Sequence, residues 1–590
     1  MKASDYFAQL MAGLGIRHAF GLQGGAVVHL FDSLENQREV SCIYMHHEES
    51  AALAAVAAAK VSKKPGLAIV TTGPGGTNAL TGLLAAWQDS VPVIFVSGQV
   101  RLDATSYGKN VRQVGSQEFA ILDVVKPMTK YAALIRSTAD IARVFTEAAD
   151  IARSGRPGPV WIDFPLDIQW QEMTPEPLLA PAATRPVAPL SVGHEEQLGA
   201  LAADLRRARR PLVFAGHGVH LGDAEAALIA FCERHHVPVV TTWGASDVLA
   251  SAHPLNGGVV GLSGQRGANQ LVFQCDLLLV LGANLTSTQV GASRRPYAAQ
   301  ARRVAITHDR DQLAVSTVTL DDHIEADIGL SLALLERLLA DAPLAPEAAW
   351  ADAVATARAR NLKGSVDLES FDYMPSGLMS SNIAVHLLSK YLQHTHHLVV
   401  DGGGTALYAG FQSAVRGEGR RLVCSMGISS MGTGLAETVG VSLSFGRCPV
   451  LTVIGDGSFL MNIQDLASLA QHRIPAAVAI INNNGYLAIK HTQRDYLGAR
   501  YYGTQAEFGL TIPAFGAIVE GFGLRYREIT TYYQLEAAAR ELAKNPAGLV
   551  LDIKVDPNQD TLFRQAVTFS ANGTSAPCDL SEMWPFSPSA

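Results

Sequence analysis

The sequence predicts an α/β protein of three consecutive doubly wound domains, each built on a parallel sheet covered by helices. The first observation is that short apolar runs alternate with helical patterns along the whole chain, as in parallel sheets joined by crossover helices. The second is that these runs have the length of buried strands. The third is that glycines follow several of the runs, at the carboxyl edge where open α/β sheets bind ligands.

Three blocks of the chain carry these runs. The runs cover residues 66–72, 91–98 and 159–165 in the first block, 211–216, 237–242 and 276–283 in the second, and 398–404, 449–457, 477–483 and 548–554 in the third. Each run is expected to form one strand of its block's sheet. Blocks of this size are separate domains and not a short-period repeat array.

Two stretches are expected to connect the blocks. Residues 174–190 carry five prolines, which favours an extended linker, and residues 341–376 begin with prolines and continue in a helical pattern. The predicted domains are therefore residues 1–172, 191–340 and 376–555, followed by a tail at 556–590. Because the tail is rich in Ser, Pro, Thr and Asn, two alternatives stay open for it, an arm on the surface or a disordered segment.

Composition excludes several classes of protein. The 590 residues are 48% hydrophobic and 17% charged, so the chain is not globally disordered. A formal net charge of −8 gives no electrostatic footprint for nucleic acid or for an anionic membrane. The six cysteines form no CxxC pair, and no apolar run reaches the length of a membrane-spanning helix. A reducing, cytoplasmic location without a signal peptide is expected.

The third block carries the most specific signal. Asp456 follows one strand and Asn483 follows the next, 27 residues later (483 − 456), so both side chains are expected at one sheet edge. Their oxygens suit Mg²⁺ or Ca²⁺, and Gly455 and Gly457 let backbone N–H groups approach a phosphate. The alternative for the GDG segment alone is a tight turn without a ligand.

This GDG and NN spacing resembles that of thiamine-diphosphate enzymes, and residues 1–555 resemble the acetolactate-synthase-like branch throughout. The resemblance implies a pyrimidine-binding domain, a central domain and a diphosphate-binding domain, in that order. It implies that Asp456, the Asn483 side chain and the Gly485 carbonyl bind Mg²⁺, which bridges to the diphosphate. It also implies a homodimer or homotetramer with active sites at the subunit interface.

Further loops are similar to the family's cofactor-binding segments. Residues 401–408 match a diphosphate loop, although acetolactate synthases usually carry Gln-His where Gly404 and Thr405 stand, and residues 425–440 match the segment under the bent cofactor. There Met431 would separate the two rings, and the alternative is ordinary core packing. The residues that the resemblance assigns to the cofactor are Thr72, Gly404, Thr405, Ser429, Met431, Gly455, Gly457, Ser458, Asn483 and Gly485.

Three residues of the first block are expected to be catalytic. His47-Glu48 fits the family's His-Glu pattern, so the resemblance implies that Glu48 shares a proton with the aminopyrimidine. Without the resemblance, the alternative is that Glu48 is a first-turn carboxylate that complements the helix dipole. Gln117 matches a Gln that reaches into the cofactor pocket. Gly25 belongs to residues 20–28, which together with residues 71–82 match the glycine loops near the pyrimidine.

The acceptor side departs from true acetolactate synthases. Asn284 and Thr288 stand where those enzymes carry two Arg residues, one of which holds the acceptor's carboxylate. Three other family residues, a Phe, a Trp and a Lys, are replaced by Ser116, Thr492 and Leu166. With Leu487, these residues predict a roomier and less cationic acceptor pocket. A ketone such as a nucleotide-linked keto-sugar is the expected acceptor, and residues 579–586 of the tail resemble a subgroup of such enzymes.

The resulting prediction is a carboligase that uses thiamine diphosphate and Mg²⁺, decarboxylates pyruvate and transfers the acetyl unit to a carbonyl acceptor. Acetolactate synthase proper, with pyruvate as acceptor, and a flavin-linked pyruvate oxidase are the alternatives. A simple decarboxylase is less favoured, because the His-His pair of those relatives does not occur in residues 98–120. Residues 215–218 and 261–269 match segments that line FAD in acetolactate synthases, and an empty vestigial domain is the alternative.

Overall fold

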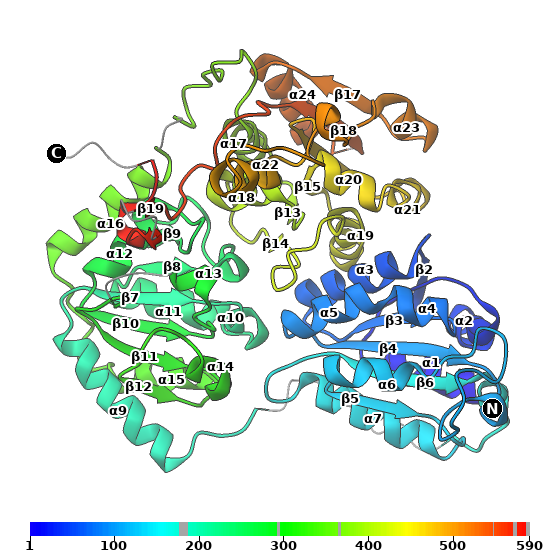
Figure 1. Ribbon diagram of the computed structural model, residues 1–590. Coiled ribbons are helices and arrows are strands. Elements are labelled where there is room, and N and C mark those ends of the chain that lie inside the picture. Colours follow the sequence, from blue (N-terminus) through cyan, green and yellow to red (C-terminus); the bar gives the residue numbers. More distant parts are fainter. Residues whose placement is uncertain (176–186, 292–295, 364–366, 547, 570–574, 586–590) are drawn as a thin grey trace.

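The computed structural model describes residues 1–175, 187–291, 296–363, 367–546, 548–569 and 575–585. Three parallel six-stranded sheets follow one another along the chain, each with its own helices, and Figure 1 shows them as three bodies around a common centre. The predicted α/β architecture of three consecutive domains is confirmed. Parts of both predicted connectors and of the tail, residues 176–186, 364–366, 570–574 and 586–590, lie outside the described residues.

The N-terminal sheet has the order β2-β1-β3-β4-β6-β5. Its strands are β1 (His18–Gly21), β2 (Ser41–Tyr44), β3 (Gly66–Val70), β4 (Val93–Gln99), β5 (Tyr131–Leu134) and β6 (Val160–Pro165). Its helices are α1 (Ala3–Gly13), η1 (Gly25–Val27), α2 (Val28–Gln37), α3 (Glu48–Ser62), α4 (Pro74–Asn78), α5 (Leu80–Gln88), η2 (Leu102–Ala104), α6 (Ile121–Val125), η3 (Lys126–Met128), α7 (Asp140–Arg153) and α8 (Leu166–Gln169).

The central sheet has the order β12-β11-β10-β7-β8-β9. Its strands are β7 (Pro211–Ala215), β8 (Val239–Thr241), β9 (Asn256–Val259), β10 (Leu277–Leu281), β11 (Arg302–Ile306) and β12 (Asp322–Ile324). Its helices are α9 (Val192–Arg207), α10 (Gly218–Leu221), α11 (Glu225–His235), η4 (Trp243–Ala245), α12 (Arg266–Gln274), α13 (Ser287–Val290), α14 (Arg310–Ala314), α15 (Ile328–Leu338) and α16 (Ala348–Asn361).

The C-terminal sheet has the order β14-β13-β15-β16-β18-β17. Its strands are β13 (His397–Val400), β14 (Leu422–Val423), β15 (Val450–Gly455), β16 (Ala476–Asn482), β17 (Tyr526–Ile529) and β18 (Leu549–Lys554). Its helices are α17 (Ser381–Leu392), α18 (Gly404–Ser413), α19 (Gly434–Ser444), α20 (Asp456–Met461), α21 (Asp465–Gln471), α22 (Leu487–Tyr496), η5 (Ala506–Phe508), α23 (Gly516–Gly521) and α24 (Tyr532–Lys544).

Small residues let the alanine-rich helix α3 pack closely on both sides. A side chain at Gly82 of α5 would meet the Ala52 methyl at 2.3 Å, and one at Gly440 of α19 would meet the Ala54 carbonyl at 2.2 Å. Helix α3 therefore lies between its own sheet's helices and α19 of the C-terminal domain, which Figure 1 shows directly above it. One hydrophobic core consequently includes residues of both domains.

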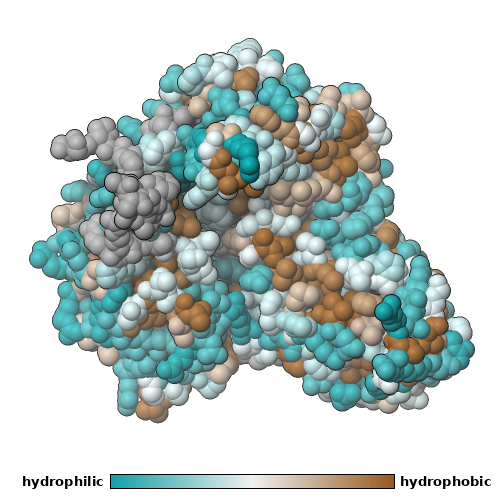
Figure 2. All heavy atoms as spheres, in the orientation of Figure 1, coloured by the Kyte–Doolittle hydropathy of each residue, from teal (hydrophilic) through white to brown (hydrophobic). Residues whose placement is uncertain are grey.

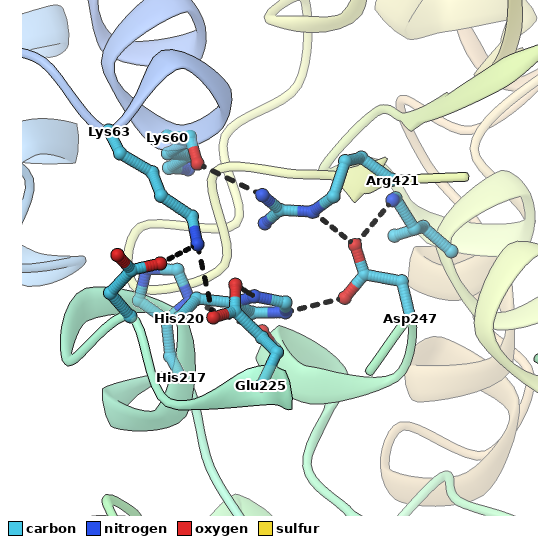
Figure 3. A network of polar contacts seen from close by, with 10 residues as sticks. Lys60, Lys63, His217, His220, Glu225, Asp247 and Arg421 are labelled. Atoms are coloured by element: carbon cyan, nitrogen blue, oxygen red, sulfur yellow. Dashed lines mark hydrogen bonds and ion pairs between the residues drawn. The ribbon is translucent and has the colours of Figure 1, made fainter. Parts of the chain in front are cut away.

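A polar network joins the three domains (Figure 3). Asp247 of the central domain accepts from His220 Nε2 at 2.7 Å and from Arg421 Nε at 2.8 Å. His220 Nδ1 lies 2.8 Å from Glu225, and Glu225 also pairs at 3.1 Å with Lys63 at the end of α3. The side chains of His220 and Asp247 are 4% and 1% exposed, so the centre of this network is shielded from solvent, whereas Lys63 at its edge is 42% exposed.

The described part of the tail lies on the central domain. Strands β19 (Val567–Phe569) and β20 (Ser575–Pro577) pair antiparallel, and η6 (Leu580–Glu582) follows them. Leu580 and Met583 are fully buried, which anchors the segment. The described residues of the tail therefore form an arm on the central domain, which was one of the two alternatives. Among all the helices described, there is none whose length and apolar character would suit a membrane span.

Candidate active site

Three adjacent strands of the C-terminal sheet, β13, β15 and β16, end beside one another. Each is followed by a helix that begins at the sheet's carboxyl edge: α18 and α22 after a turn, and α20 directly after β15. The turns pack so tightly that a side chain at Gly403 would meet Ser458 Oγ at 2.1 Å and Met431 Cγ at 3.1 Å. This edge therefore offers a narrow cradle of backbone at the N-termini of helices, which suits a phosphate group.

Asp456 is the first residue of α20 and is 2% exposed. Its carboxylate accepts from the backbone N–H groups of Gly457 at 2.7 Å and Gly485 at 3.1 Å. Burial raises the pKa of Asp456 to about 6 although these N–H groups oppose the shift, and the Asp552 carboxylate raises it further. A buried carboxylate in this setting is stabilised by a cation.

The neighbouring residues supply further oxygen atoms. Asn483 is 7% exposed, and its Nδ2 lies 3.4 Å from Thr405 Oγ1, so the turns after β13 and β16 meet. Gly485 has a φ of +153°, and a side chain there would meet the Thr504 carbonyl at 2.1 Å. No group of three or more His, Cys, Asp or Glu side chains suited to a metal occurs in the described ranges. One carboxylate, one amide and one carbonyl fit Mg²⁺ that is completed by phosphate oxygens and water.

Asp401 organises the same edge, and the sequence interpretation gave it no role. It is fully buried and accepts from the N–H groups of Gly403 and Gly434, each at 3.0 Å. A hydrogen bond from Ser458 also lowers the pKa of Asp401, but burial outweighs these bonds and raises it overall. The signal in the sequence was its position directly after a strand, at the start of the DGGG turn.

The segment before α19 is held by the N-terminal domain. Asp89 accepts from the N–H groups of Met426 at 3.2 Å and Gly427 at 2.7 Å. Ser429 is exposed with a φ of +44°, and Met431 is half-buried outside the main hydrophobic cores. The side chain of Met431 therefore borders the cradle at Gly403, which leaves it available to a bound molecule.

Glu48 begins α3, as the resemblance requires of a residue facing the cofactor. It is 7% exposed and accepts from Asn78 Nδ2 at 3.0 Å. A side chain at Gly75 would come within 3.4 Å of Glu48 Oε1. The carboxylate thus faces the second glycine loop, at the N-terminus of the long helix α3.

The two glycine loops of the N-terminal domain meet each other. A side chain at Gly24 would meet the Thr71 side chain at 2.5 Å, whereas Gly25 faces open space. Gln117 is exposed with a φ of +62°. A Cβ atom added at Gly73 would lie 2.2 Å from the carbonyl oxygen of Gln117, so the two backbones are in close contact. Thr72, Gly73 and Gln117 therefore form one packed unit.

The single chain does not gather all the predicted residues. The hydrogen bond to Glu48 comes from the N-terminal domain, and those to Asp456 come from the C-terminal domain. Among the acceptor residues, Leu487 lines a small cavity with Thr405, while Asn284 and Thr288 line a different one. Ser116 and Thr492 are exposed and border neither cavity. These roles stay predictions.

The cavity that Asn284 and Thr288 line has a volume of about 510 Å³ and takes its lining from all three domains. Figure 2 shows a hollow near the centre of the face on which the domains meet. Two segments were predicted to line a flavin. His217 and Gly218 of residues 215–218 line this cavity, but no residue of 261–269 does. Burial lowers the pKa of His217 to about 4, and its Nε2 has no hydrogen-bond partner among the described residues. Arg156, also in the lining, pairs with Asp309.

Comparison with known families gives three matches along the chain. The N-terminal TPP binding domain of thiamine pyrophosphate enzymes matches residues 1–124, the central domain of these enzymes matches residues 198–335, and their C-terminal TPP binding domain matches residues 402–553. The matches occur in the order of the three sheets.

Individual relatives match over almost their whole length. The acetolactate synthase large subunit of Lactococcus lactis is 30% identical, with 89% of this chain and 88% of the relative covered. The probable acetolactate synthase large subunit of Methanocaldococcus jannaschii is 29% identical over 94% and 92% of the two chains. The large subunit of acetolactate synthase isozyme 1 of Escherichia coli is 28% identical over 94% of each.

Proposed function

This chain belongs to the thiamine-diphosphate enzymes of the acetolactate-synthase-like kind, and we propose that it is a carboligase acting on pyruvate. It removes carbon dioxide from pyruvate and joins the remaining two-carbon unit to a carbonyl acceptor. The observation that carries the proposal is the buried Asp456 beside Asn483 and Gly485, at an edge formed by three helix N-termini.

The residues at that edge fit thiamine diphosphate and Mg²⁺. When bound, the cofactor supplies the nucleophilic carbon and the electron sink for decarboxylation. Asp456, the Asn483 side chain and the Gly485 carbonyl hold Mg²⁺. The backbone around Gly404, Thr405, Gly455, Gly457 and Ser458 would receive the diphosphate, because helices α18 and α20 begin there with first-turn N–H groups.

The pyrimidine end of the cofactor is assigned to Glu48, Gly25, Thr72 and Gln117, with Ser429 and Met431 beneath it. Glu48 shares a proton with the ring and so sets its protonation state. Because the predicted site residues Ser116, Gln117 and Thr492 are exposed in the single chain, we propose that a second copy of the chain completes each site. The enzyme is then a homodimer or homotetramer.

Acetolactate formation is the activity proposed first, with a second pyruvate as acceptor. Its support is that relatives named acetolactate synthase match this chain over about nine-tenths of their length. Incubation with pyruvate, thiamine diphosphate and Mg²⁺ tests it, with acetolactate and carbon dioxide as the expected products.

A second candidate is a neutral ketone as acceptor, such as a keto-sugar. The observation that favours it is that Asn284 and Thr288 line the large cavity, while Arg156 is neutralised by Asp309. A carboxylate acceptor then lacks a free Arg at this position. A competition assay between pyruvate and a panel of neutral ketones decides between the two acceptors.

FAD is proposed as the ligand of the large cavity. Its volume is in the range of cofactor sites, and the buried, unpartnered Nε2 atom of the half-buried His217 supplies a polar group for a ligand. The absorption spectrum of the purified protein tests for a bound flavin.

The six cysteines are all free, which agrees with the reducing cytoplasm that we propose as the location of the protein.

A further inference from the structure

Asp163 is a buried carboxylate to which the reaction proposed above gives no role. It lies near the end of β6 and is fully buried. Three side chains donate to it: Ser97 Oγ at 2.6 Å, Tyr107 Oη at 2.8 Å and Gln99 Nε2 at 3.0 Å. Strand pairing places Ser97 of β4 directly opposite Asp163. A carboxylate with this many donors is a fixed acceptor and not a chance burial.

Gln99, one of these donors, has every hydrogen-bonding position in use. Its Nε2 donates to Asp163 and to the Phe119 carbonyl, both at 3.0 Å. Its Oε1 accepts from the Thr72 hydroxyl and the Val100 N–H, both at 2.9 Å. Because Gln99 is 1% exposed, water does not substitute for any of these partners, and the amide has a single satisfied orientation.

The partners of Gln99 and Asp163 hold the segment that carries Gln117. Residues 105–120 contain no helix or strand, so the segment depends on side-chain anchors. Tyr107 and Phe119 attach its two ends to Asp163 and Gln99. Thr72 Oγ1 lies 3.5 Å from the Gln117 carbonyl, and Gly73 packs directly beneath it.

Glu118 strengthens the same segment from within. It is 3% exposed and accepts from the N–H and hydroxyl of Ser106, at 2.8 and 2.7 Å, and from the Val114 N–H at 3.1 Å. The loop is therefore rigid within itself, and its attachment to the sheet passes through Asp163 and Gln99.

We propose that Asp163 is a positioning residue for the carboligation: by fixing the amide of Gln99, it holds Gln117 and Thr72 in place at the cofactor. The inference rests on the proposed function, because it takes Gln117 to be the residue of this loop that faces the bound substrate. Asp163 itself touches neither cofactor nor substrate.

The chemistry requires a carboxylate at this position. An amide at residue 163 has one acceptor oxygen in place of two, so in either orientation at least one of the three buried donors loses its acceptor. When the new NH₂ group faces Gln99, a rotation of the Gln99 amide to restore that bond turns the Gln99 NH₂ toward the N–H of Val100, which leaves another buried donor without an acceptor. The Asp163→Asn variant therefore keeps the shape of the side chain but loosens the Gln117 loop.

The ionised form of Asp163 is the one that accepts from all three donors. Burial raises the pKa of Asp163 to about 6, Ser97, Gln99 and Tyr107 oppose the shift, and Glu118 adds to it. As the pH falls through this range, the carboxyl group takes up a proton and loses acceptor capacity. An acid limb near pH 6 is expected in the pH profile of kcat.

The main experiment compares wild type, Asp163→Asn, Gln117→Ala and the double variant. We expect Asp163→Asn to lower kcat about ten- to hundredfold at pH 8, with unchanged retention of thiamine diphosphate. If Asp163 acts through Gln117, the double variant loses less activity than the two single losses combined. Additive losses would overturn the proposal.

Two further variants separate positioning from general stability. Ser97→Ala leaves the orientation of Gln99 intact, so it should retain wild-type kcat at pH 8. Both Ser97→Ala and Tyr107→Phe remove a donor to the carboxylate, so the acid limb should move to higher pH. In Asp163→Asn the limb should vanish. An acid limb at the same pH in all four proteins would contradict the proposal.

Hydrogen exchange of residues 105–120 tests the proposal without any assay of activity. Asp163→Asn should exchange faster than wild type across this segment, and Ser97→Ala should not. Equal exchange in wild type and Asp163→Asn would overturn the positioning role even in an active carboligase. Wild-type protein that forms no product from pyruvate would instead refute the proposed function, with the exchange result standing separately.

Discussion

Lys60 Nζ lies 2.7 Å from Asp89 Oδ2, and the two side chains are 3% and 5% exposed. The same ammonium group donates to the Cys424 carbonyl at 2.7 Å, while Asp89 accepts from the N–H groups of Met426 and Gly427. One buried ion pair of the N-terminal domain thus fixes the segment of the C-terminal domain that is proposed to lie under the cofactor.

Lys60→Met should destabilise the protein strongly, because it leaves Asp89 buried without its cation. Breaking a buried pair from one side costs about 3–5 kcal/mol. Lys63→Met, one turn along the same helix, is the matched control. Its side chain is 42% exposed, so its loss should cost about 1 kcal/mol or less. Urea unfolding of both variants measures the difference, and equal midpoints would contradict the account.

The stability of the domain junction should depend on pH through His220. Burial alone would lower its pKa, but Asp247, and then Glu225, outweigh burial and the nearby Arg421, so the pKa is raised. The stabilising contribution is therefore complete below pH 6.5, the ordinary value, and is lost as the pH rises through the raised pKa.

Thermal unfolding of wild type and His220→Gln between pH 6 and pH 9 checks this sign. Wild type should lose stability with rising pH more steeply than the variant, because Gln carries no charge in this range. The two slopes would be equal if His220 were neutral throughout, and the junction would then need another explanation.

Glu48→Gln should bind thiamine diphosphate but turn over slowly. The amide keeps the shape of the carboxylate and cannot share a proton with the pyrimidine, and general acid–base contributions are typically ~10²–10⁴-fold. Glu49→Gln is the control, since this neighbour lies on a different face of α3. Near-normal turnover of Glu48→Gln with cofactor bound would exclude the assigned role.

Asp456→Ala should lose the cofactor, because it removes the carboxylate of the proposed Mg²⁺ site. Asp465→Asn is a suitable control: its carboxylate is also fully buried but begins α21. Equilibrium dialysis with thiamine diphosphate and Mg²⁺ measures retention. Equal retention by Asp456→Ala and wild type would place the cation elsewhere.

Restoring Arg at Thr288 together with Trp at Thr492 should shift the products toward acetolactate. A charge-assisted bond to the acceptor's carboxylate contributes about 1.5–3 kcal/mol, which corresponds to roughly one to two powers of ten in selectivity. The ratio of acetolactate to ketone adducts in a competition assay reports the shift. An unchanged ratio would mean that these two positions do not contact the acceptor.

The sequence predicted ten of the twelve inner strands, but it missed the inner strands β1 and β11 and all six edge strands. Strands such as β4 and β16 are buried at every residue, so they appear as continuous apolar runs. The edge strands β2, β5 and β17 contain half-buried or exposed positions and have no such run. Edge strands are set by pairing with a neighbour, which a local pattern does not contain.

The site was predictable where residues follow a strand directly. Asp456 and Asn483 were identified because parallel strands bring their carboxyl ends to one edge. Asp89 and Asp163 were not, because their partners, at Met426 and at Ser97, lie far along the chain. The acceptor positions Ser116 and Thr492 are exposed, and a local pattern does not contain the contacts that we propose a second copy of the chain makes with them.

Product analysis with labelled pyruvate as sole donor tests the central claim most directly. In the presence of thiamine diphosphate, Mg²⁺ and a panel of ketones, wild type should release carbon dioxide and form a new carbon–carbon bond, giving acetolactate or a ketone adduct. Asp456→Ala should form neither. Acetaldehyde as the only product, or acetate with reduction of a bound flavin, would contradict the assignment of this chain as a carboligase.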